Sequence, residues 1–167
     1  MAYQMNVDGM AELSEMLEKM ENEAPKAAAR ALYTGAGMMS EEIRKGAEGI
    51  RTAPFKYAKP GENRLPSPEE KEIVLAAGAG IAKFNKNGTE VDTSVGFRNS
   101  GYAELDGKMV PIPKIVNAIN SGTSFMKKQP FVRKAARTAS NKVLEAMRKS
   151  IEAEFEAIGK GYKDSMK

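Results

Sequence analysis

The stretch Ile-Ala-Lys-Phe-Asn-Lys-Asn-Gly-Thr-Glu-Val-Asp-Thr-Ser-Val-Gly-Phe, residues 81–97, decides the fold class of this chain. Polar and apolar residues alternate in the segment before Asn87-Gly88, and they alternate again in residues 89–97 after it. An Asn-Gly pair between two alternating segments is the strongest short signal for a β-hairpin, because both residues tolerate the positive φ of a tight turn. The sequence therefore predicts an antiparallel hairpin near the middle of the chain. One face of its second strand would carry Val91, Thr93 and Val95.

Helical patterns lie on both sides of this hairpin. Apolar residues recur every three or four positions in residues 9–23 and again in residues 25–50, and Pro25 between them predicts two separate helices. A further stripe, from Pro130 to about residue 158, predicts a long closing helix. Helices placed before and after a small antiparallel sheet indicate an α+β domain.

Shorter helices and strands are predicted between the hairpin and the long helices. Ser67, followed by Pro68 and two acidic residues, is typical of a helix start and predicts a short helix to about residue 77. Residues 102–110 predict a short strand or a second hairpin, and residues 113–122 predict a short helix that ends at its glycine.

The 167 residues indicate a single domain over residues 1–158, with an extended proline-rich loop at 51–66. The charged, glycine-containing residues 159–167 predict a flexible tail. The chain starts without the basic and apolar regions of a signal peptide, and its longest nearly apolar run has ten residues. We therefore expect neither export by a signal peptide nor a membrane span.

The composition restricts the chemistry available to the chain. It contains no cysteine, histidine or tryptophan, which excludes thiol nucleophiles, imidazole bases and the commonest nitrogen and sulfur metal ligands. A hydrolase or nuclease using carboxylates and a divalent ion is still conceivable, but most acidic residues lie on helix stripes that we expect to face solvent. We expect no enzymatic activity, no cofactor, no metal and no small-molecule substrate.

Charge is distributed unevenly along the chain. Residues 1–24 hold six acidic residues and one basic residue, whereas residues 127–149 hold eight basic residues and one acidic residue. Opposite charges of this kind suit subunits that meet head to tail, or a basic surface that meets an anionic partner. Two solvated helix faces would explain the same pattern.

The candidate contact residues lie in the basic segment and in the proline-rich loop. The aromatic and basic side chains of the loop could stack single-stranded bases, or they could form an arm that anchors in a neighbouring subunit, which we favour. The candidates for a subunit or partner interface are Phe55, Lys56, Tyr57, Lys59, Arg64, Lys127, Lys128, Arg133 and Arg137.

Several short motifs resemble a known family. The opening Val7-Asp8-Gly9-Met10-Ala11-Glu12-Leu13 precedes an alanine-rich helix, and Gly122-Thr123 precedes Gln129-Pro130-Phe131-Val132-Arg133-Lys134-Ala135 at the start of the last helix. In these motifs and in the order of its elements, the chain resembles the tail-completion, or head-tail joining, proteins of long-tailed bacteriophages. The motif positions that carry the resemblance are Gly9, Leu13, Gly122, Thr123, Pro130, Phe131 and Ala135.

The resemblance implies a structural virion protein, assembled in the bacterial host cytoplasm and located in the tail or neck. It implies a homo-oligomeric ring, hexameric by expectation, at the head-proximal end of the tail. The implied partners are the neck or connector, tail-terminator and tail-tube proteins, with DNA contact possible in the lumen of the ring. A different class of function stays open: a small basic nucleic-acid-binding protein that uses the closing helix and the 51–66 loop.

Overall fold

The computed structural model describes residues 10–54, 62–87, 90–97 and 101–165. These residues form four helices and three two-stranded antiparallel sheets, which confirms the α+β class. The helices are α1 (Met10–Glu48), α2 (Pro68–Ala77), α3 (Ile112–Ser121) and α4 (Phe131–Ser165). The strands are β1 (Gly80–Ile81), β2 (Asn85–Asn87), β3 (Glu90–Asp92), β4 (Val95–Gly96), β5 (Tyr102–Leu105) and β6 (Lys108–Pro111).

The prediction of two helices before and after Pro25 is wrong, because α1 runs through this proline as one helix of 39 residues. A proline inside a helix removes one hydrogen bond and costs about 3 kcal/mol. Packing against α4 favours continuity: Ala27 and Ala31 are buried just after the proline, and Arg30 pairs with Glu154 of α4 at 2.5 Å. Tertiary contacts have therefore overridden a strong local signal.

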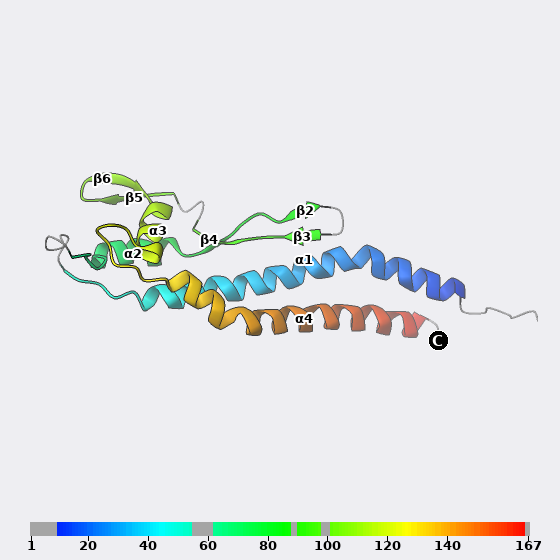
Figure 1. Cartoon of the computed structure of the whole chain (residues 1–167). Coiled ribbons are helices and arrows are strands. Elements are labelled where there is room, and N and C mark those ends of the chain that lie inside the picture. Colours follow the sequence, from blue (N-terminus) through cyan, green and yellow to red (C-terminus); the bar gives the residue numbers. More distant parts are fainter. Residues whose placement is uncertain (1–9, 55–61, 88–89, 98–100, 166–167) are drawn as a thin grey trace, which may run out of the picture.

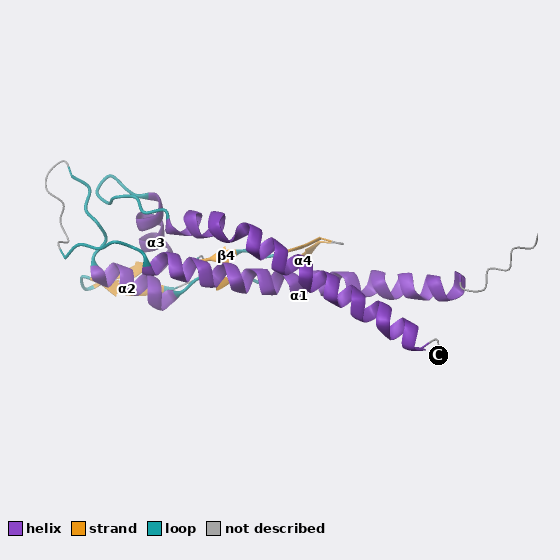
Figure 2. Cartoon of the chain, turned by 90° about the horizontal axis from the view of Figure 1, so that it is seen from below, coloured by secondary structure: helices purple, strands orange, loops and turns teal. Residues whose placement is uncertain are grey.

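Helices α1 and α4 pack side by side in opposite directions and cross at a shallow angle (Figures 1 and 2). Gly35 permits the close approach, since an added Cβ would lie 2.5 Å from the Met147 sulfur and 3.2 Å from Val143 Cγ1. Gly46 faces the carbonyl oxygen of Phe131 in the same way, at 3.2 Å.

The prediction of a flexible tail from residue 159 is also wrong where the structure describes it, because α4 continues to Ser165. Extending an established helix adds one hydrogen bond for each residue fixed, without a second nucleation cost. That gain outweighs the local penalty of Gly159.

The central hairpin is confirmed, and its turn at residues 88–89 lies outside the described residues. Strand β2 pairs with β3, with Asn87 opposite Glu90, and β4 pairs with β1, with Ile81 opposite Val95. The single second strand predicted at 89–97 is interrupted. Between the β1–β4 pair and the β2–β3 pair, residues 82–84 of one strand lie opposite residues 93–94 of the other, so three residues face two. This is the arrangement of a β-bulge, which bends a strand and interrupts its ladder. The resulting ribbon lies along α1 (Figure 1).

The second hairpin and the short helices follow their local signals. Strands β5 and β6 are joined through Asp106 and Gly107, both at positive φ. Helix α2 starts with a capping box between Ser67 and Glu70, as its sequence predicts in part, and α3 ends at Gly122.

The hydrophobic core lies at one end of the long helix pair, where α1 ends and α4 begins. Figure 1 shows α2, α3 and the β5–β6 hairpin gathered there. None of the described helices is long and apolar enough to cross a membrane. The most deeply buried large side chains of the core are Ile43, Val74, Ile119 and Met126.

Candidate interaction site

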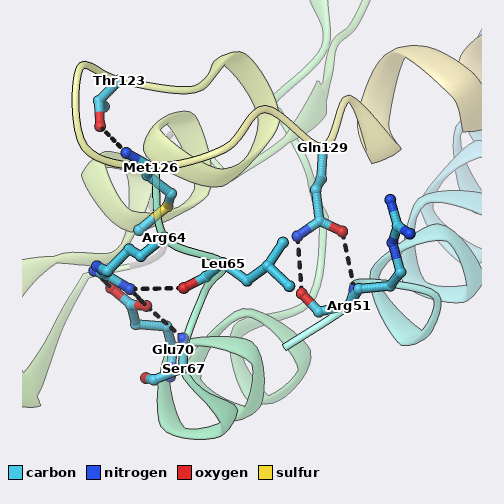
Figure 3. Close-up of polar contacts among 8 residues, drawn as sticks. All are labelled: Arg51, Arg64, Leu65, Ser67, Glu70, Thr123, Met126 and Gln129. Carbon is cyan, nitrogen blue, oxygen red and sulfur yellow. Dashed lines mark hydrogen bonds and ion pairs between the residues drawn. The ribbon is translucent and has the colours of Figure 1, made fainter. Parts of the chain in front are cut away.

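Both ends of the 51–66 loop meet a distant segment where α4 begins, and we call this region the junction (Figure 3). The segments of the junction are residues 51–53, residues 62–66 and residues 120–131. The last segment links α3 to α4 and contains the Gly-Thr and Pro-Phe motifs.

The Gly-Thr motif forms a tight turn. Gly122 has φ +78°, and an added Cβ would lie 3.0 Å from the Lys128 Cβ and 3.2 Å from its backbone nitrogen. Thr123 and Met126 exchange hydrogen bonds: the Thr123 N–H donates to the Met126 carbonyl, and the Met126 N–H donates to Thr123 Oγ1, both at 3.0 Å. Glycine and threonine are therefore required here by backbone geometry and hydrogen bonding.

The end of the proline-rich loop pairs with this turn. The Arg64 N–H donates to the Phe125 carbonyl at 2.8 Å, and the Lys127 N–H donates to the Arg64 carbonyl at 2.8 Å. This two-bond bridge runs parallel, with Arg64 opposite Met126. Residues 62–66 of the proline-rich loop are thus held by backbone pairing with a distant segment.

The Arg64 side chain binds within its own chain. Its two terminal nitrogens donate to the two carboxylate oxygens of Glu70, each at 2.6 Å. The side chains of Arg64 and Glu70 are 16% and 5% exposed. The Ser67 N–H donates to the same carboxylate at 2.7 Å. Arg64, a predicted partner-contact residue, therefore stabilises the junction, and its guanidinium is occupied.

Burial alone would raise the pKa of the Glu70 carboxyl, but the hydrogen bonds from Arg64 and Ser67 outweigh burial and hold that pKa below its ordinary value of 4.5. The hydrogen bond to Glu70 likewise raises the pKa of Arg64. Both groups carry their charges at neutral pH.

Two amide side chains fix the start of α4. Gln129 holds the peptide of Arg51 from both sides, accepting from its N–H at 2.9 Å and donating to its carbonyl at 2.8 Å. Asn120 accepts from the Val132 N–H at 3.2 Å and so caps the first turn of α4. The aromatic ring of Phe131, which is buried, packs edge-on against Phe97 with 6.2 Å between ring centroids.

A basic surface borders the junction. Its side chains are exposed, and none of them forms an ion pair with another described residue. A hollow of about 460 Å³ opens among them, between the end of α1 and the start of α4, and Ile50, Phe131 and Ala135 form part of its lining. The residues of the basic surface are Arg51, Lys127, Lys128, Arg133, Lys134 and Arg137.

Apart from Arg64, which is held by Glu70, the predicted site residues fall into three groups. Lys127, Lys128, Arg133 and Arg137 are exposed at or just before the start of α4, and Lys128 lines the hollow. Gly122, Thr123, Pro130, Phe131 and Ala135 lie in or beside the junction, and Phe131 and Ala135 are buried. Phe55, Lys56, Tyr57, Lys59 and Gly9 lie outside the described residues, and Leu13 lies in α1.

Sequence reasoning missed Glu70, Asn120 and Gln129 as parts of this site. The capping signal at Ser67 pointed to Glu70 as a helix-start acid, but nothing local indicated its pairing with Arg64. Gln129 begins the Pro-Phe motif, but no local signal showed the roles of Asn120 and Gln129, because their partners are backbone groups of other segments.

Acidic clusters suited to metal binding are absent within residues 10–54, 62–87, 90–97 and 101–165. Comparison of the chain with protein-family models, with curated proteins and with solved structures finds no match. Chemically, the site offers a rigid backbone scaffold bordered by unpaired cations, which suits recognition of an anionic macromolecular surface.

Proposed function

We propose that this chain is a structural component of a tailed bacteriophage, a tail-completion or head-tail joining protein that forms a ring at the head-proximal end of the tail. Its partners would be further copies of itself, a hexamer in our proposal, together with the neck or connector, tail-terminator and tail-tube proteins. It would be assembled in the host cytoplasm and retained in the virion.

The observation that carries the proposal is that the two later motifs behind the resemblance, Gly-Thr and Pro-Phe, fold into one unit. Gly122 and Thr123 build the turn, residues 62–66 pair with it, and Pro130 and Phe131 start α4 from it. Motifs held together by backbone pairing suit a scaffold that presents a fixed surface to partners. An assembly protein needs such a surface, and it needs no catalytic group.

The test is the composition and the assembly of virions from the host strain. Mass spectrometry of gradient-purified particles should find the protein, and a stop codon in its gene should leave filled heads and tails unjoined. A plasmid copy of the gene should restore joined particles. Infectious particles that form without the protein would contradict the proposal.

The basic surface favours a second candidate function, nucleic-acid binding. Its exposed cations would contact phosphates, so affinity for duplex DNA should fall steeply with salt. Charge reversal at Arg133 and Arg137 should then weaken DNA binding, whereas the same change at Glu41 and Glu48, which pair with Arg44 in α1, should not. Absence of DNA binding at low salt would remove this candidate.

A further inference from the structure

The two long helices carry unbalanced charge at opposite ends. Near the start of α1, the side chains of Glu15, Glu18 and Glu21 are exposed, and none of them forms an ion pair with another described residue. We call these three residues the acidic tip. They contrast with Glu23, a neighbour on the same helix, whose carboxylate pairs with Lys26 at 2.6 Å.

The opposite charge lines the hollow beside the junction. Arg51, Lys128 and Lys134 are exposed around it and form no ion pair with another described residue. We call this hollow the basic cleft. Lys45 also lines it, but Glu42 already pairs with that ammonium at 2.9 Å. Three cations of the basic cleft are therefore available to an acidic partner.

Within one copy the acidic tip and the basic cleft cannot meet. The antiparallel packing places Gly46 of α1 against Phe131 of α4, next to the basic cleft. From Glu18 to Gly46 the helix rises about 40 Å at 1.5 Å per residue. Salt screens exposed charges over about 8 Å at physiological ionic strength. The charges of the acidic tip and of the basic cleft therefore do not neutralise each other within one chain.

The two surfaces also match in their apolar parts. Leu17 is 56% exposed and lies one helical turn before Glu21 of the acidic tip. The lining of the basic cleft combines its cations with the apolar residues Ile50 and Phe131. An exposed leucine next to a carboxylate complements a hollow whose lining combines apolar residues with ammonium and guanidinium groups.

We infer that the acidic tip of one copy docks in the basic cleft of the next. The contact joins two different surfaces, so it repeats from copy to copy and produces a ring when the rotation closes. This inference rests on the proposed function for the ring itself, and it names the contact that would hold that ring together. The partner that it assigns to both surfaces is a second copy of this chain.

The first experiment uses charge exchange in the full chain, with mass measured by light scattering at low and physiological salt. A tip variant carries Glu15→Lys, Glu18→Lys and Glu21→Lys, and a cleft variant carries Arg51→Glu, Lys128→Glu and Lys134→Glu. Each variant alone presents like charges at both ends, so we expect its association to be at least about tenfold weaker than that of the wild type. An equal mixture of the two variants, and the chain with all six changes, should regain association.

A matched control separates this contact from general charge effects. Glu145→Lys with Glu152→Lys reverses two exposed charges in the middle of α4, where these residues pair with Lys149 and Arg148 and line neither surface, and it should leave association unchanged. Circular dichroism should show the same helix content in all variants, since every altered side chain is exposed.

A second experiment uses the absence of cysteine from the chain. Leu17→Cys in one pool and Thr138→Cys in another place single thiols on the acidic tip and beside the basic cleft. A short bismaleimide should link the two pools to each other, whereas Thr34→Cys, exposed in the middle of α1, should not link to Thr138→Cys.

The possible outcomes distinguish failure of the inferred contact from failure of the proposed function. A chain that stays monomeric at low salt and forms no Leu17–Thr138 cross-link overturns the inference, as does a mixture of variants that fails to regain association. A cleft variant that loses DNA binding in a chain that never self-associates would assign the basic cleft to nucleic acid instead. Virions that lack the protein would remove the phage proposal and leave the contact standing, so the two failures are distinguishable.

Discussion

Replacing Arg64 by methionine tests whether the junction depends on a buried ion pair. Methionine keeps most of the aliphatic volume and removes the guanidinium. It would leave Glu70, whose side chain is 5% exposed, with only its hydrogen bonds to Ser67. Removing one partner of a buried pair typically costs 3–5 kcal/mol. Because the Ser67 N–H still donates to the carboxylate, we expect the free energy of unfolding to fall by about 3 kcal/mol.

The measurement is urea unfolding followed by circular dichroism, supported by thermal melts. For a chain of this size about 3 kcal/mol corresponds to a melting temperature lower by about 6–12 °C. Glu70→Gln alone should cost about 2 kcal/mol, since Arg64 is slightly more exposed than Glu70 and glutamine preserves a hydrogen-bonding oxygen. The double variant leaves no buried charge and should be more stable than Arg64→Met alone.

The pH dependence supplies an independent check of the same reasoning. The pKa of Glu70 is lowered in the folded state, so its stabilising contribution is complete above the ordinary value of 4.5 and is lost as pH falls through the folded pKa. Without Arg64, the hydrogen bond and the charge that lower this pKa most are lost, so the pKa of Glu70 is higher in the variant than in the wild type. The stability difference between wild type and Arg64→Met should therefore shrink as pH falls below 4.5. A constant difference, or a cost below about 1 kcal/mol at neutral pH, would refute the role given to this pair.

Three further changes and one control variant test the packing around the junction and the helix pair, each by urea unfolding. Gly35→Ala should destabilise the fold by about 1 kcal/mol, because overpacking against α4 exceeds the gain in helix propensity. Gly37→Ala is the control: its added Cβ meets nothing within 4 Å, so it should stabilise by up to about 1 kcal/mol. Equal effects of the two changes would argue against close packing at Gly35. Gly122→Ala should cost about 2 kcal/mol through positive φ and contact with the following backbone, and a neutral result would show that the turn relaxes freely. Gln129→Leu should cost about 1 kcal/mol, because it removes two hydrogen bonds to the Arg51 backbone at an exposed site where water can partly replace them, and amide hydrogen exchange should quicken at the Arg51 N–H; unchanged exchange would contradict the assignment.

The elements that the sequence predicted correctly have signals that act over a few residues. The Asn87-Gly88 hairpin, the Ser67 helix start and the Gly122 helix end each depend on the conformational preferences of neighbouring residues. The two wrong predictions, a helix break at Pro25 and a tail from residue 159, also relied on local preference. At Pro25, the free energy gained by packing α1 against α4 exceeded the cost of the proline. Beyond residue 159, the hydrogen bonds gained by extending α4 exceeded the cost of the glycine.

The candidate site divides along the same line. The sequence alone determined the α+β class, the basic segment and the short motifs, because composition and spacing are properties of the chain itself. Only the tertiary structure decided that residues 62–66 pair with the Gly-Thr turn, that Arg64 is held by Glu70, and that Gln129 holds the Arg51 peptide. These contacts join segments up to 78 positions apart, and their free energy comes from burial and hydrogen bonding that exist only once the segments are brought together.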